Sequence, residues 1–157
     1  MPRNRLVARK RDGRYSLRLP DDVRQLLGSL LEEMRELLTA DQPADGRLER
    51  LFPPAYLADP EKNAEYQRYM RSELLTSRLS ALDQVRDTLT AKDLTEPQLT
   101  AWMTSLNSVR LVLGTMLDVS EDDRLDELSP EDPSFGGHLL YGELSVILEH
   151  IVAALGE

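Results

Sequence analysis

Apolar residues recur at steps of three and four along four stretches of the chain, the spacing of amphipathic helices that share a core. Asp21 and Asp22 favour the start of the first helix, and Thr95 with Gln98 forms a capping box at the start of the third. The predicted helices span residues 21–40, 60–90, 96–118 and 138–155. This pattern predicts an all-α, four-helix bundle-like domain.

Residues 5–19, ahead of the first helix, alternate between apolar and polar positions, which predicts a β-hairpin. Asp12-Gly13 is typical of a two-residue type I′ turn. One face of the second strand is apolar and the other basic: Tyr15, Leu17 and Leu19 against Arg14, Ser16 and Arg18. An isolated hairpin is barely stable in water, so this one must pack on the helices or pair with a second copy of itself.

The predicted second and last helices carry further signals. Asp59 and Pro60 suit the N-cap and first position of the second helix. Tyr66 and Tyr69 on that helix indicate either core packing or an interface. The last helix is so apolar that we expect it in the centre of the core or in a dimer interface. The residues that would be exposed in the dimer case are Ile147, Ile151 and Leu155.

Composition favours one globular domain, spanning residues 1–157 and able to bury its own core. No apolar run approaches the roughly 18 residues of a membrane span, and the N-terminus lacks the apolar segment of a signal peptide. We therefore expect a cytoplasmic protein with no membrane contact. The chain has no cysteine, which excludes disulfides, thiolate nucleophiles and any thiol redox switch within it.

Charge is divided unevenly along the chain. Residues 1–18 hold seven basic residues and one acid, or +6, whereas the whole chain holds 19 basic and 28 acidic residues, or −9. The remainder therefore carries −15. The candidate binding residues are Arg9, Lys10, Arg11, Arg14 and Arg18. Their charge fits three interpretations: contact with the protein's own acidic surface, an acidic protein partner, or DNA phosphate reached by a two-stranded ribbon.

No catalytic or metal motif stands out. A calcium loop starting at Asp118 would need glycine at its sixth position and glutamate at its twelfth, where this chain has Asp123 and Ser129. Neither His138 nor His150 follows a glutamate by three residues, as a di-iron bundle requires. We therefore predict that the protein is not an enzyme and binds neither metal nor cofactor.

Charged residues on the second and third helices predict a structural ion-pair network between them. Arg110 lies inside a dense apolar segment, so its guanidinium needs polar partners. The proposed members are Glu65, Arg68, Glu73, Arg78 and Arg110. The alternative is that one of these arginines binds a ligand.

Four segments of the chain resemble an actinobacterial family catalogued as domain of unknown function 2017. They are residues 51–56, 65–68, 78–82 and 102–119, the last being the most specific. One member of that family is described as an oxidative-stress transcriptional regulator. The resemblance implies a cytoplasmic regulator of redox homeostasis that acts with an alternative sigma factor on genes of cysteine biosynthesis.

Two positions depart from what the resemblance implies. The regulator is thought to sense oxidation through a cysteine pair, which this chain lacks, and Ser108 stands where the family pattern has aspartate. We therefore predict a non-enzymatic regulatory protein that acts through a protein partner such as a sigma factor, with direct DNA contact through the hairpin as a further expectation. The alternative is a homodimeric structural or adaptor module with no nucleic-acid role.

Overall fold

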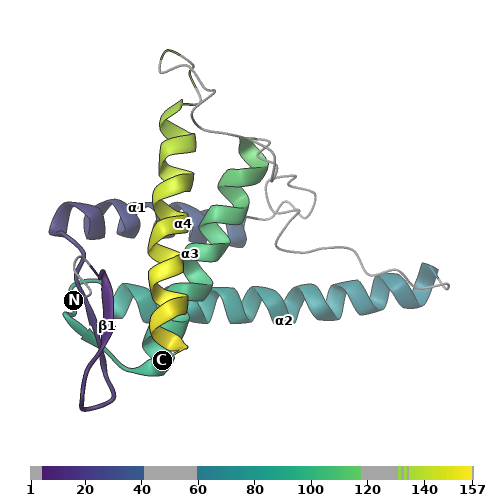
Figure 1. The fold of residues 1–157 in the computed structure, drawn as a ribbon. Helices are drawn as coiled ribbons and strands as arrows, with labels where there is room; N and C mark the ends of the chain where they lie inside the picture. The colour runs from purple at the N-terminus through teal and green to yellow at the C-terminus, as the bar shows by residue number, and fades with distance from the viewer. Residues whose placement is uncertain (1–4, 41–59, 118–130, 132, 134, 157) are drawn as a thin grey trace.

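The computed structural model describes residues 5–40, 60–117, 131, 133 and 135–156. The predicted N-cap at Asp59 and the acidic segment that begins at Asp118 lie outside this part of the chain. The elements, in order, are β1 (Val7–Arg9), β2 (Tyr15–Leu17), α1 (Asp21–Thr39), α2 (Pro60–Asp87), β3 (Asp93–Leu94), α3 (Glu96–Met116) and α4 (Phe135–Leu155) (Figure 1). The predicted all-α class with a leading hairpin is confirmed.

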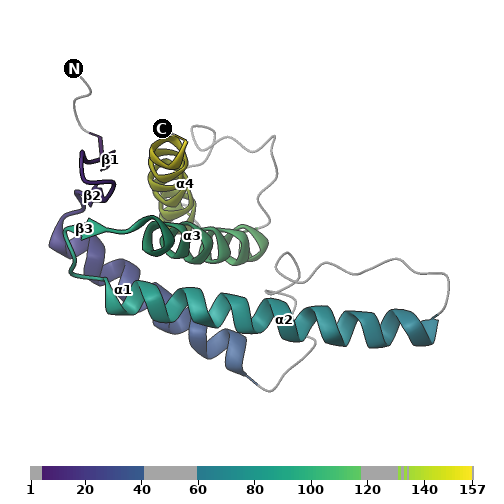
Figure 2. The same cartoon turned by 90° about the horizontal axis from the view of Figure 1, so that it is seen from below.

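The described helices form layers. Figure 2 shows α4 as the outer layer, α3 beneath it, and α1 with α2 on the far side of α3. The small sheet lies at one end, beside the C-terminal half of α4, while the N-terminal half of α2 extends away from the other helices. The core lies where the layers meet, and its central side chain is Trp102, which is fully buried.

The capping box predicted at the start of α3 is present. The Gln98 backbone N–H donates to Thr95 Oγ1 at 3.3 Å, and the Thr95 backbone N–H donates to Gln98 Oε1 at 2.9 Å. Two helix-end donors are thereby satisfied within the segment that joins the sheet to α3.

Replacing Thr95 with alanine is expected to lower the free energy of unfolding by about 1 kcal/mol, because the Gln98 N–H loses its acceptor. Urea unfolding followed by circular dichroism measures this change. Thr95→Ser, which keeps the hydroxyl, is the control. An alanine variant as stable as the unmodified chain would show that the cap contributes nothing.

The predicted type I′ turn is wrong. Arg9 pairs with Tyr15 across the hairpin, and the Lys10 N–H donates to the Arg14 carbonyl at 2.7 Å, which leaves a loop of three residues. Gly13 is the last residue of this loop. Among the described glycines it alone has a positive φ, which is 89°. Three-residue hairpin loops characteristically place a left-handed residue there. The Asp12 side chain accepts the Arg14 N–H at 2.9 Å.

A third strand, which the sequence pattern did not predict, completes the sheet. β3 pairs antiparallel with β2, with Tyr15 opposite Leu94, so the strand order is β1-β2-β3. The Leu17 N–H also donates to the Lys92 carbonyl at 2.8 Å. The hairpin therefore packs on its own chain, with its apolar face in the core.

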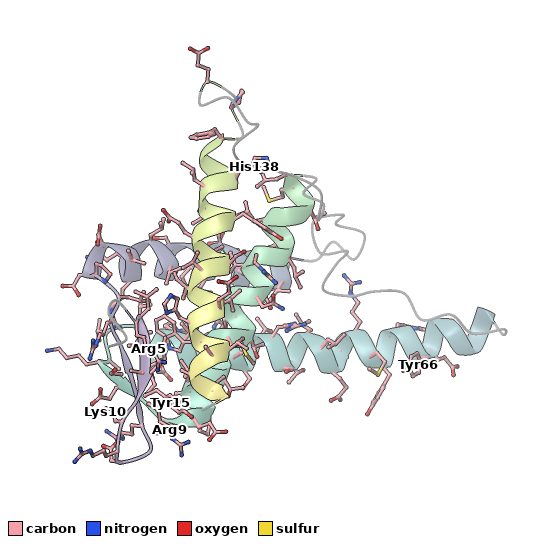
Figure 3. The ribbon with its side chains drawn as sticks, viewed as in Figure 1. Arg5, Arg9, Lys10, Tyr15, Tyr66 and His138 are labelled. Carbon is pink, nitrogen blue, oxygen red and sulfur yellow. The ribbon has the colours of Figure 1, made fainter. Side chains whose placement is uncertain are left out.

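The structure bears on two alternatives that the sequence left open. Ile147 and Ile151 of α4 belong to the core, so they are not a free dimer surface. Tyr66 and Tyr69 of α2 are 46% and 63% exposed, which excludes core packing for them. Both tyrosines lie on the half of α2 that extends from the body, and Figure 3 shows Tyr66 there.

Of the helices that the structure describes, α4 has the length and composition of a membrane span, with a mean hydropathy of 1.3 over its most apolar window. Length and composition alone carry little weight, because the core helix of a globular domain passes the same test. In this fold one face of α4 packs into the core through Leu144, Leu148 and Ala154.

Candidate partner-binding site

The hairpin has two chemically distinct faces. Tyr15, Leu17 and Leu19 are buried in the core, whereas Arg14 and Arg18 are exposed. The alternation predicted for this strand is therefore confirmed. Because successive side chains of a strand point to opposite sides, Arg14 and Arg18 extend from the outer face of the sheet.

The five candidate basic residues are all exposed, but they do not share one face. Lys10 lies opposite Arg14, and Arg18 follows on the same face of the second strand. Arg11 is in the loop, and Arg9 lies opposite Tyr15 on the other face. Figure 3 shows Arg9 and Lys10 together on the hairpin. The structure thus places a basic outer face of three residues beside a basic loop.

Part of this charge is balanced within the chain. Lys10 Nζ lies 2.7 Å from Asp93 Oδ2 on β3, and this hydrogen bond raises the pKa of Lys10 above its ordinary value. The interpretation that basic residues of the hairpin pair with acidic residues of the same chain therefore holds for Lys10. Among the described residues, no carboxylate pairs with Arg11, Arg14 or Arg18.

A buried arginine, Arg24 of α1, fixes the hairpin to the helices. Its side chain is 6% exposed and makes four hydrogen bonds, all to backbone carbonyls. The acceptors are Leu17 at 2.8 Å, Leu19 at 3.1 Å, Leu89 at 2.7 Å and Ala91 at 2.8 Å. Burial lowers the pKa of Arg24, and nearby Asp21 acts in the opposite direction. One guanidinium therefore joins β2, the start of α1 and the α2–β3 connection.

Sequence reasoning missed Arg24, although a signal was present. The buried residues of α1 are Arg24, Leu27, Leu31, Met34 and Leu38, at steps of three and four. Arg24 thus occupies the first position of the apolar stripe. A charged residue in such a position requires polar partners inside the fold.

Arg110 bonds to neutral groups, which corrects the expected ion-pair network. Its guanidinium donates to Asn107 Oδ1 at 3.0 Å and to Ser145 Oγ of α4 at 3.4 Å, and it lies 5.9 Å from the centre of the Tyr141 ring. Arg110 therefore joins α3 to α4, whereas the prediction had it pair with carboxylates of α2.

The other proposed members of that network all lie on α2. Burial lowers the pKa of Arg78, and its Nε is buried without a hydrogen-bond partner among the described residues. Glu65, Arg68 and Glu73 are exposed. A network that includes these four residues stays a prediction.

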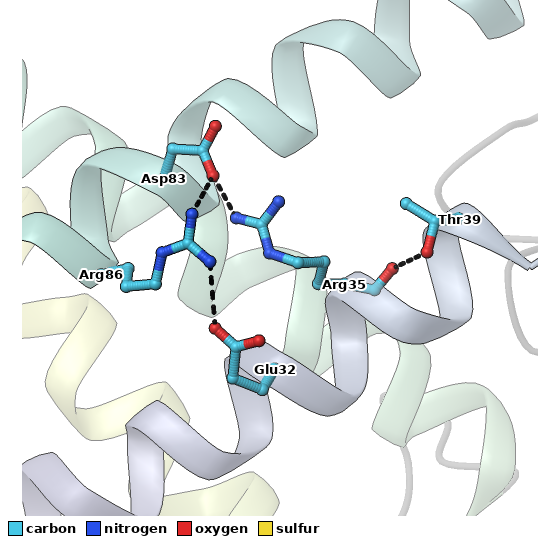
Figure 4. Close-up of polar contacts among 5 residues, drawn as sticks. All are labelled: Glu32, Arg35, Thr39, Asp83 and Arg86. Carbon is cyan, nitrogen blue, oxygen red and sulfur yellow. Dashed lines mark hydrogen bonds and ion pairs between the residues drawn. The ribbon is translucent and has the colours of Figure 1, made fainter.

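The ion pairs that join helices in the described part of the chain lie between α1 and α2 (Figure 4). Asp83 pairs with Arg35 and, at 3.0 Å, with Arg86. Arg86 also lies 3.6 Å from Glu32. These groups are mostly half-exposed, so each pair contributes little to stability and the set mainly fixes how α1 crosses α2.

Within the described ranges, no three side chains of histidine, aspartate or glutamate gather closely enough to hold a metal ion. The hairpin region offers charged groups for recognition. Its elements are a rigidly held sheet, three exposed arginines and an acidic remainder of the chain.

Comparison with known proteins identifies the family. The model of a domain of unknown function, DUF2017, matches residues 4–155. An oxidative stress regulator from Mycobacterium leprae, AosR, is 31% identical over 134 residues, which cover 74% of this chain and 61% of that protein. The Mycobacterium bovis protein of the same name is 29% identical over 145 residues, covering 80% of this chain and 66% of the relative.

These matches span about three fifths to two thirds of the curated relatives' length. No solved structure matches the chain significantly. The family model covers nearly the whole chain, including the hairpin and all four described helices. This chain therefore belongs to the DUF2017 family.

Proposed function

We propose that this chain is a non-enzymatic regulator of the oxidative-stress response, which acts in the cytoplasm by binding a protein partner through its basic hairpin. The relatives named as oxidative stress regulators support the regulatory role. The observation that carries the binding surface is the exposure of Arg14 and Arg18 on the outer face of a sheet that Arg24 fixes to the helices, with Arg11 exposed in the adjoining loop.

The proposed partner presents an acidic surface, and an alternative sigma factor is our specific candidate. Arginine suits this contact because its planar guanidinium bonds a carboxylate through two parallel N–H groups. A sheet that is already folded loses little conformational entropy on binding.

DNA is the second candidate ligand, since a two-stranded ribbon can enter the major groove. The outward arginines of β2 favour it. One observation favours a protein instead. β3 widens the two-stranded ribbon to three strands.

Reversing the charge of the hairpin tests this proposal in cells. We expect the triple change Arg11→Glu, Arg14→Glu and Arg18→Glu to abolish rescue of a strain that lacks the native gene, measured as survival of oxidant and as transcript levels of cysteine-biosynthesis genes. These side chains are exposed, so the variant should accumulate normally.

The matched control replaces the same three arginines with lysine, which retains the charge. It should rescue at least partly, because an ammonium group still attracts carboxylates. Full rescue by the glutamate variant, at equal protein level, would contradict the proposed role of the hairpin.

A further inference from the structure

His150 connects α4 to the segment that leads into β1. The Leu6 backbone N–H donates to His150 Nδ1 at 3.4 Å, although the two residues are 144 positions apart in the chain. Figures 1 and 2 both show β1 beside the C-terminal half of α4. The histidine therefore joins the last helix to the start of the hairpin, at the opposite end of β1 from the loop that carries Arg11.

This hydrogen bond exists only while the imidazole is neutral. An Nδ1 atom that accepts a hydrogen bond carries a lone pair, so the single ring proton is on Nε2. Protonation makes both ring nitrogens donors, and the Nδ1–H group would then face the Leu6 N–H. The contact is partly buried, so water replaces the lost acceptor only in part. A proton on His150 therefore turns this attraction into a repulsion.

The imidazole is accessible to protons from solvent. His150 is partly exposed and lines a pocket of about 260 Å³. The charged groups on the described elements packed around it are Arg5 and Arg9 at β1, Glu143 and Glu149 on α4, and Glu96 and Arg110 on α3. Of these, Arg5 and Glu149 line the same pocket. Glutamate and arginine keep their charge between about pH 5 and 8, whereas histidine changes its charge there.

We propose that this contact is a pH-sensitive device, in which neutral His150 holds the start of β1 against α4 and protonation releases the Leu6 N–H. The change is confined to the start of β1, because other contacts hold the hairpin. The Arg18 N–H donates to the Leu6 carbonyl at 2.7 Å, and Val7 is buried in the core. The contact stabilises the fold while the imidazole is neutral, and this contribution is lost as the pH falls through the titration of His150. The device operates whichever partner the hairpin binds.

Amide hydrogen exchange, measured by NMR on the full chain, tests this device. The protection of the Leu6 N–H, taken relative to an unstructured chain at the same pH, should fall about fivefold between about pH 7.5 and about pH 5.5. Its midpoint should coincide with the titration of the His150 Cε1–H resonance. The internal control is the Lys10 N–H, which donates to the Arg14 carbonyl at 2.7 Å and should keep its protection.

Three variants separate the titration of His150 from other effects of pH. His150→Asn places a carbonyl oxygen, an acceptor that does not titrate, near the position of Nδ1, so Leu6 should stay protected at both pH values. His150→Phe removes the acceptor, so the protection should be low at both. The matched control is His138→Asn, about 18 Å away along α4, which should leave the pH dependence unchanged.

Circular dichroism establishes that each variant is folded before exchange is compared. Leu6 protection that does not change with pH in the unmodified chain would overturn the proposal. So would protection that still falls at low pH in His150→Asn, because the titrating group would then lie elsewhere. Neither result bears on the charge-reversal variants of the hairpin, which are tested separately.

Discussion

Replacing Arg24 with methionine is expected to lower the free energy of unfolding by about 3–5 kcal/mol, the cost of removing one partner from a buried polar network. The side chains are similar in length, so the apolar packing is largely kept. The change removes the donors of four backbone carbonyls at once, those of Leu17, Leu19, Leu89 and Ala91. Because these carbonyls belong to β2, its exit and the α2–β3 connection, the sheet should loosen from the helices before the bundle unfolds.

Urea unfolding measures this loss, followed by circular dichroism and by the fluorescence of Trp102, the sole tryptophan of the chain. Arg18→Met is the matched control, because Arg18 is exposed and its replacement should change stability by no more than about 0.5 kcal/mol. If the two variants were equally stable, Arg24 could not be what holds the sheet.

Truncating Trp102 to alanine is expected to lower the free energy of unfolding by a similar amount, about 3–5 kcal/mol. Trp102 is fully buried between the layers, and its Nε1–H donates to Thr88 Oγ1 at 2.8 Å. The substitution leaves a large cavity and removes the donor that ties α3 to the end of α2.

Thr88→Val separates these two contributions. It preserves the packing but leaves the indole N–H buried without an acceptor, which costs about 1–3 kcal/mol. Tyr69→Ala is the control, since this aromatic is 63% exposed and its loss should be nearly neutral. Calorimetry gives the melting temperature of all three variants. If Trp102→Ala melted at the same temperature as Tyr69→Ala, Trp102 could not be the central side chain of the core.

Periodicity explains why the helices and the hairpin were predictable. Each described helix carries an apolar stripe at steps of three and four, and the second hairpin strand alternates as strands do. The third strand had no such signal, because Asp93 and Leu94 are only two residues and pair with a partner far away in the chain. The loop length of the hairpin also depended on register, which Asp12-Gly13 alone does not fix.

The chemistry of the arginines was harder to predict than the fold. Arg24 lies in an apolar stripe, but its acceptors come from residues 17–19 and 89–91, which only the folded chain brings together. Arg110 was expected to need polar partners, and it has them in Asn107 of its own helix and Ser145 of α4, without a carboxylate. Sequence spacing identifies a buried charge and leaves its partners undetermined.

The face of α4 illustrates the same limit. The sequence showed a helix apolar on more than one side, which fits either a core position or an interface. The structure places one face of the helix in the core, whereas an interface on its other side stays a prediction. Ile147 and Ile151 are in the core, while Leu139 and Val146 face outward.

The exposed arginines of the hairpin are proposed to bind an acidic protein. Sedimentation velocity of the full chain tests this proposal most directly, with the purified alternative sigma factor of the same organism and, separately, with a labelled DNA duplex. Each mixture is measured at ~50 mM and ~200 mM salt, because phosphate-driven binding weakens steeply over that range. We predict co-sedimentation with the sigma factor that the Arg11, Arg14 and Arg18 to glutamate variant loses and the lysine variant keeps. Binding unchanged by charge reversal, or co-sedimentation with the duplex alone, would contradict the claim.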